Sequence, residues 1–176
     1  ITEDLTHAWM RGGTAHPWAG MTEPDETMAA PGYSWCKAPR LGGKGFEVGA
    51  LARQVVDGHP LAVALAGGGV LARLAGGIEP GAAYMARGEM PRNGQGAGLV
   101  EAARGALGHW LKVEKGRIAS YQIIAPTTWN FSPRDAAGVP GPLEAALEGL
   151  EVEGPGALAV QHVVRSFDPC MVCTVH

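Results

Sequence analysis

Several features that would place this chain in a common functional class are missing from its sequence. It has no run of five like charges and a net charge of only −3, which argues against a nucleic-acid-binding surface. The most apolar stretch, Leu61–Gly77, contains Arg73 and many glycines, so it does not predict a membrane span. The first residues, from Ile1 onward, do not resemble a signal peptide.

Phosphate-loop and disulfide-scaffold patterns are also missing. Gly43 and Lys44 are followed by Gly45 rather than by serine or threonine, so no nucleotide phosphate loop is predicted. The chain has three cysteines, and two of them form a close C-x-x-C pair. This odd count argues against a secreted disulfide scaffold.

What is present indicates one compact unit of the α+β class, with mixed helices and short β-hairpins. The 176 residues are 46% hydrophobic, and the 27 glycines and 13 prolines predict many turns. The first 45 residues are rich in Gly, Pro, Trp and His, so we expect no long element there apart from a helical turn near Thr2–Met10.

Four later segments carry clearer patterns. The expected elements are two helices in Glu47–Gly76 interrupted at Gly58–Pro60, a hairpin over His109–Pro126, a short helix over Pro142–Gly149, and an extended or strand segment over Val160–Phe167. Between the helices and the hairpin, a looser stretch runs to Gly98.

The last eleven residues, SFDPCMVCTVH, carry the chemistry. Thiolates of Cys170 and Cys173 can face one ion, and soft donors suit nickel, zinc or iron. Spacing alone favours a partial zinc site or a pair of reduced thiols over a redox-metal role, and a structural zinc would need four ligands. Cys36 lies far away in sequence and is best interpreted as a small buried apolar side chain.

The surrounding residues extend this pattern over most of the chain. The end reads D-P-C-x-x-C-x-x-H, the block Glu101–Asp135 contains ARGALGHW and PTTWN, and YSWCKAPRLGGKGFEVGALAR precedes that block. In this order the segments resemble the C-terminal part of the large, catalytic subunit of nickel–iron hydrogenases, most closely the uptake (group 2) branch. In that family the precursor is trimmed after the final histidine.

The resemblance implies roles for four residues. Cys170 would bind nickel, and Cys173 would bridge nickel and iron, whose other ligands are CO and cyanide. Arg104 would hang over the open coordination position and assist proton removal, although an isolated arginine is ordinarily a surface ion-pair residue. Asp168 would hold that arginine in place, beyond its ordinary part as a turn-former before Pro169.

Further residues follow from the same resemblance. Pro126 and Thr127 would face the diatomic ligands of iron. His176 and the backbone carbonyl of Ile123 would bind a separate magnesium or iron ion. Ala103 stands where the family usually has proline, which we interpret as a subgroup marker.

The family also needs an upstream cysteine pair that this chain does not contain. We therefore expect residues 1–176 to be a single unit, part of a split or cleaved large subunit and incomplete without the N-terminal segment. The expected partners are that segment and an iron–sulfur small subunit. No nucleic-acid partner or direct membrane span is expected, and the complex would be a higher hetero-oligomer.

The expected activity is heterolytic oxidation of H2, with electrons passing to the small-subunit clusters. The alternatives are a hydrogen sensor with slow turnover and, more distantly, a zinc-binding interaction module. Because the uptake branch mostly stays on the cytoplasmic side, we expect a cytoplasmic protein whose membrane association, if any, is through partners.

Overall fold

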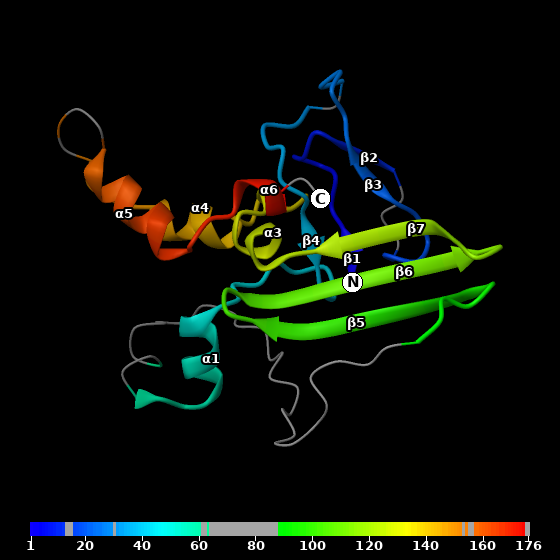
Figure 1. Cartoon of the computed structure of the whole chain (residues 1–176). Coiled ribbons are helices and arrows are strands. Elements are labelled where there is room, and N and C mark those ends of the chain that lie inside the picture. Colours follow the sequence, from blue (N-terminus) through cyan, green and yellow to red (C-terminus); the bar gives the residue numbers. More distant parts are fainter. Residues whose placement is uncertain are drawn as a thin grey trace.

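The fold is seen in a computed structural model, which describes residues 1–12, 16–29, 31–60, 63, 88–152, 154 and 157–174. Its centre is a three-stranded antiparallel sheet of β5 (Gly94–Ala102), β6 (Gly105–Glu114) and β7 (Arg117–Ile124), in that order (Figure 1). The predicted hairpin is confirmed as β6 and β7. Its turn residues Lys115 and Gly116 have φ of 53° and 73°, as a two-residue type I′ turn requires.

Strand β5 was not predicted, because Gly94, Gly96 and Gly98 give this segment a low strand propensity. It forms nonetheless because β6 offers a continuous partner, with pairs running from Gly94–Val113 to Ala102–Gly105. The stretch up to Gly98 is thus more regular than expected. All residues of β5 before Glu101 are exposed.

One face of the sheet covers the core. The buried cluster consists of Val48, Ala106, Trp110, Ile124 and Trp129, and partly buried Ile1, Trp18 and Phe46 pack against it. Trp110 and Ile124 come from the predicted hairpin. The core therefore joins the hairpin to the segment before α1 and to the segment after β7.

Short strand pairs carry the N-terminal segment over this core. β1 (Thr2–Glu3) pairs with β4 (Pro39–Arg40), and β2 (Met10–Gly12) pairs with β3 (Thr22–Pro24). The absence of long elements among the described residues before 46 agrees with the prediction. The predicted helical turn near residues 2–10 is wrong, because these residues make tertiary backbone pairs that override weak local propensity, including Asp4 N–H to Ala38 O at 2.8 Å.

Five described helices complete the fold. They are α1 (Ala50–Val56), α3 (Pro126–Asn130), α4 (Pro142–Leu147), α5 (Leu158–Ser166) and α6 (Met171–Thr174). Helices α1 and α4 confirm two predictions. Most of the second helix predicted before Gly76 lies outside the described residues, and the described Pro60 and Val63 are helical. None of the helices in the described part of the chain is long and apolar enough to cross a membrane.

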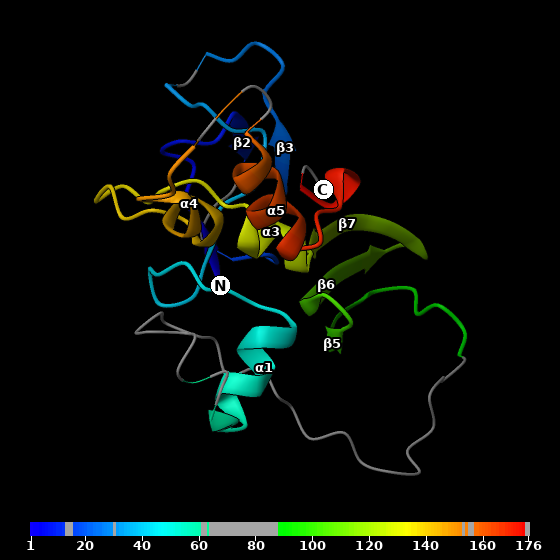
Figure 2. The ribbon, with the colours of Figure 1, turned by 90° about the vertical axis from the view of Figure 1, so that its left-hand side faces the viewer.

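The expected strand over residues 160–167 is wrong, since this segment is helix α5. Val160, Val164 and Phe167 recur every three to four residues, and this helical period outweighs the β-preference of valine. Helices α3 and α6 contact each other beside the end of β7, while α4 and α5 lie farther out (Figures 1 and 2). The α+β class is confirmed.

Candidate metal centre

Arg104 lies at the tip of the β5–β6 hairpin. Ala102 pairs with Gly105, so Ala103 and Arg104 are the two loop residues. The tip packs tightly against the segment before α1: a Cβ on Gly105, whose φ is +126°, would approach Val48 Cγ2 to 2.7 Å. Only glycine fits this position without strain, so the close packing presents Arg104 from a defined turn.

Asp168 is positioned by the end of α5. Its φ is +50°, in the left-handed region that aspartate tolerates better than most residues, and its N–H donates to Arg165 O at 2.9 Å. Phe167 packs edge-on against Phe131, with ring centroids 6.4 Å apart. The helix end is thereby anchored beside α3, which fixes the backbone that carries the Asp168 carboxylate.

Arg104 and Asp168 form an ion pair across this gap, with Arg104 Nε 2.7 Å from Asp168 Oδ2. Their side chains are 51% and 66% exposed, so the pair contributes little stability and mainly orients the guanidinium. Both residues line a hollow of about 520 Å³, together with Glu47, Leu51 and Phe167. Burial raises the pKa of the Glu47 carboxyl above its ordinary value.

Cys173 lies on the single helical turn of α6, and Cys170 is the residue immediately before that turn. Cys173 N–H donates to Cys170 O at 3.0 Å, and the two sulfurs form a disulfide with Cα atoms 5.3 Å apart. Once reduced, the two thiolates would face the same side and could bind one ion. Cys170 comes two residues after Asp168, so Arg104 is brought to the cysteine pair through its ion pair.

Helix α3, with the sequence PTTWN, packs against α6 and supports it. All five of its residues are buried. Thr127 Oγ1 accepts a hydrogen bond from Cys170 N–H at 3.3 Å, and Thr128 Oγ1 donates to Cys173 O at 2.8 Å. Thr127 therefore contacts Cys170 directly, and Pro126 precedes it at the start of the same helical turn, rather than in an open hairpin exit.

Cys36 does not join the pair. Its thiol is 5% exposed and donates to Thr128 O at 3.6 Å, and burial raises its pKa to about 12. The prediction of a small buried side chain is confirmed. Within the described residues, no three Cys, His, Asp or Glu side chains converge as a metal-binding group.

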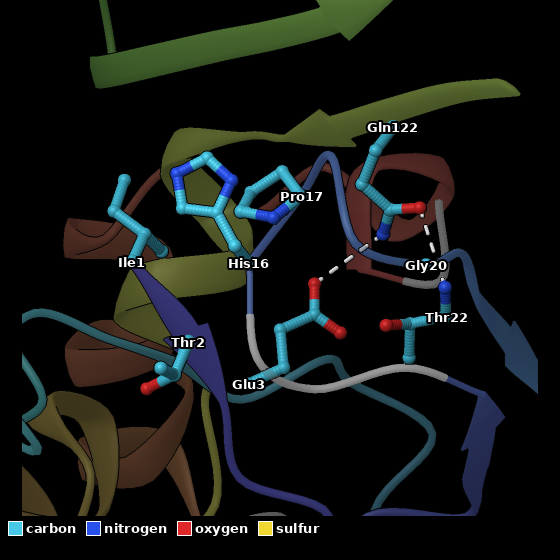
Figure 3. Close-up of a pocket in the computed structure, with 8 residues that line it drawn as sticks. All are labelled: Ile1, Thr2, Glu3, His16, Pro17, Gly20, Thr22 and Gln122. Atoms are coloured by element: carbon cyan, nitrogen blue, oxygen red, sulfur yellow. Dashed lines mark hydrogen bonds between the residues drawn. The ribbon is translucent and has the colours of Figure 1, made fainter.

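A second polar cluster lies beside Ile123, around the adjacent Gln122. Gln122 Nε2 donates to Glu3 Oε1, and Gln122 Oε1 accepts from Thr22 N–H, both at 3.3 Å (Figure 3). Glu3 Oε2 is buried and has no hydrogen-bond partner in the described part of the chain. A buried carboxylate oxygen suits a hard cation, and the buried Lys37 ammonium also interacts electrostatically with Glu3. His176, the other predicted ligand, lies outside the described residues.

Comparison with known proteins shows which family has this arrangement. The family model of nickel-dependent hydrogenases matches residues 1–63 and 73–176. The chain belongs to this family. It is 32% identical to the uptake hydrogenase large subunit of Afipia carboxidovorans over its whole length, and it covers 41% of that relative. It is also 32% identical to the hydrogenase-1 large chain of Escherichia coli, of which it covers 40%.

Solved hydrogenase structures share the fold. The Ni-Fe-Se hydrogenase from D. vulgaris Hildenborough in the reduced state superposes with a TM-score of 0.77 at 30% identity, over 99% of this chain and 45% of that one. The Ni-Fe-Se hydrogenase from Desulfomicrobium baculatum also gives a TM-score of 0.77, at 32% identity over 99% of this chain and 44% of that one. These likenesses confirm the predicted resemblance to a hydrogenase large subunit.

The chain spans less than half the length of the relatives named above. Its alignment with the Afipia protein extends over 246 residues, more than its own 176, so that relative has residues inside the matched region with no counterpart here. The described residues fit part of a nickel centre: two soft donors three positions apart, beside an oriented guanidinium.

Sequence reasoning missed two side chains that build the site. Arg53 on α1 donates to Ala102 O at 3.1 Å and to Ala103 O at 3.0 Å, just before Arg104. Thr128 holds the carbonyl of Cys173. Both residues lie in segments that carry the family resemblance, but no local pattern assigns either of them a role, because each acts on a segment at least 45 positions away in the sequence.

Proposed function

We propose that this chain is the C-terminal part of the catalytic large subunit of a nickel–iron hydrogenase, which oxidises H2 to two protons and two electrons. The observation that carries the proposal is the ion pair of Arg104 with Asp168, two residues before Cys170, whose carbonyl accepts the N–H of Cys173 on α6. The electrons pass to iron–sulfur clusters of a small subunit.

The cysteines hold the metals in this proposal. Cys170 would bind nickel and Cys173 would serve both nickel and iron, because thiolates are soft donors and one sulfur can serve two metals. When bound, the centre, with CO and cyanide on iron, supplies the redox metals at which H2 is split. Thr127 Oγ1 only accepts from Cys170 N–H among the described residues, so its proton is available to an iron ligand.

Arg104 and Asp168 serve the proton side of the reaction. Asp168 engages Nε of the guanidinium and leaves its terminal nitrogens for the site. A fixed positive charge there stabilises the charge separation of heterolytic cleavage. Arg104 and a cysteine sulfur take part in removing the proton, an unusual role for an arginine, whose guanidinium is ordinarily always charged.

The C-terminal cation is proposed from the polar cluster beside Ile123. His176 and the Ile123 carbonyl bind magnesium or iron, and the buried Glu3 carboxylate lies close enough to Gln122 to support a hard cation there. This ion would tie the last residues to the end of β7.

The proposed partners supply what these residues lack. We infer that residues 1–176 form one unit that docks to the remaining large-subunit segment, which carries the other cysteine pair, and to an iron–sulfur small subunit. The Wolinella succinogenes relative, 32% identical, is named a quinone-reactive Ni/Fe-hydrogenase large chain. By this likeness, any membrane association of the cytoplasmic complex goes through a partner.

The test uses the complex that co-purifies with this chain. We expect nickel and iron by elemental analysis, infrared bands of metal-bound CO and cyanide, and H2-dependent reduction of an artificial acceptor. Cys170→Ser and Cys173→Ser should lose nickel and activity, whereas Cys36→Ser, whose hydroxyl can still donate to Thr128 O, should keep both. Retained nickel and H2 uptake in either variant of the pair would refute the site.

The same measurements separate the alternatives. A hydrogen sensor would contain the same metals and infrared bands but turn over orders of magnitude more slowly. Zinc without nickel or iron would instead identify a zinc-binding module. No contact within the described residues favours either alternative over the enzyme.

A further inference from the structure

Helix α6 depends on neighbouring segments for its position. It is one turn long, and so short a helix is not stable on its own. Its ends are bonded to two other parts of the chain: Cys170 N–H to Thr127 Oγ1 at 3.3 Å, Cys173 O to Thr128 Oγ1 at 2.8 Å, and Thr174 O to Lys37 N–H at 3.0 Å. These bonds therefore fix the backbone that carries both cysteines.

Among these contacts, the Thr128 hydroxyl is the most constrained. It donates to Cys173 O and accepts from Ala125 N–H at 3.3 Å, so both of its hydrogen-bonding directions are used. The residue is completely buried, and its own carbonyl accepts the Cys36 thiol at 3.6 Å. Water cannot easily replace this hydroxyl, and its side chain has no freedom to follow a displaced helix.

We propose that Thr128 is a positioning residue that sets where the Cys173 sulfur lies relative to the Cys170 sulfur in the metal-loaded enzyme. The carbonyl it holds belongs to Cys173 itself, the residue assigned to bridge the two metals. Rotation of that peptide unit would move the sulfur, and Thr128 is the side chain that prevents it. This inference rests on the proposed function of the cysteine pair.

Thr127 and Thr128 are adjacent in the sequence but have different hydrogen-bonding roles. Thr127 accepts at the start of the cysteine pair and keeps its proton for an iron ligand. Thr128 gives its proton to the protein backbone at the end of the pair. Loss of the Thr128 hydroxyl should therefore change the metal centre through the position of a ligand, without removing any group that touches it.

The experiment compares the purified holoenzyme with Thr128→Val, which keeps the shape without the hydroxyl, and Thr128→Ser, which keeps the hydroxyl. The readouts are the positions of the infrared CO and cyanide bands, the nickel content, and kcat and KM for H2. We expect displaced or split bands and about a tenfold loss of kcat in the valine variant, the equivalent of one lost hydrogen bond. The serine variant should restore the parental bands and stay within about twofold of parental kcat, because it retains the hydrogen bond.

A role limited to stability would give a different result. Parental infrared bands in Thr128→Val, even with a lowered melting temperature, would overturn the inference while leaving the proposed function intact. If the valine variant does not assemble, Thr128→Ala provides the same test, and parental bands there count equally against the inference. A parent enzyme without nickel and without these bands would overturn the proposed function and this inference together.

Discussion

The hairpin tip that presents Arg104 is held by Arg53, and replacing Arg53 tests whether this support is needed for catalysis. From α1, Arg53 binds the carbonyls of Ala102 and Ala103 and forms a short ion pair with Glu101. These are the three residues immediately before Arg104. One planar guanidinium thus contacts all three of these residues at once, which a lysine ammonium cannot do.

The magnitude follows from the number and burial of these bonds. Hydrogen bonds from a charged donor are worth about 1.5–3 kcal/mol each when well buried. The Arg53 side chain is 32% exposed and that of Glu101 is 16% exposed, so solvent reduces these values. Arg53→Lys keeps the charge near Glu101 but loses at least one carbonyl bond, or about 1–2 kcal/mol. If this loss of free energy destabilises the ordered conformation of the hairpin tip, H2 oxidation should slow by roughly 5- to 30-fold.

The assay pairs turnover with a local measurement. H2-dependent reduction of an artificial acceptor should fall in Arg53→Lys while nickel content stays parental, and amide hydrogen exchange at residues 101–105 should become faster. Arg11→Lys is the matched control, since Arg11 forms an exposed ion pair with Glu23 at 3.6 Å that contributes little. Parental turnover and parental exchange in Arg53→Lys would show that the tip does not need this support.

Two further changes test the hollow beside the ion pair. Arg104→Lys should keep the metals bound but slow turnover by roughly a hundredfold or more. Lysine cannot bind the Asp168 carboxylate and still present a planar group of donors to the site. A parental rate would refute the role of Arg104. Glu47 provides a test of folding stability. Burial raises the pKa of its carboxyl, so the folded state favours the protonated form. The free energy of unfolding therefore falls as pH rises from the ordinary carboxyl pKa near 4.5 through the raised pKa. Glu47→Gln should therefore be at least as stable as the parent near pH 7 in denaturant melts, with the difference disappearing below about pH 4. A variant less stable at pH 7 would indicate that the carboxylate has a partner that the described residues do not include.

The sequence predicts local elements where their signals are short-range. The hairpin of β6 and β7 has alternating residues around a Lys115–Gly116 turn, and α4 has proline at its start and a glycine after its end. Strand β5 was not predicted because its glycines have a low strand propensity. The segment forms a strand because β6 pairs with it. Helix α5 was assigned wrongly because its valines were given more weight than their spacing.

The residues of the site also differ in whether a short-range sequence signal marks them. The cysteine pair is visible in the sequence because its two residues are three positions apart. The Arg104–Asp168 ion pair joins residues 64 positions apart, and only a resemblance to a known family could suggest it. Arg53 and Thr128 act through backbone carbonyls, which any residue type possesses, so the sequence of their partners contains no signal for these contacts.

The exposure of the site explains why a further segment is part of the proposal. A guanidinium stabilises charge separation most strongly where water is excluded, yet the side chains of Arg104 and Asp168 are more than half exposed in this chain. Met171 and Val172, between the two cysteines, are 78% and 66% exposed, an unusual placement for apolar side chains beside a metal centre. The chain covers only about 40% of its curated relatives, so the remaining large-subunit length is ample to cover this surface. Its docking would supply the missing ligands and the dry environment in one step.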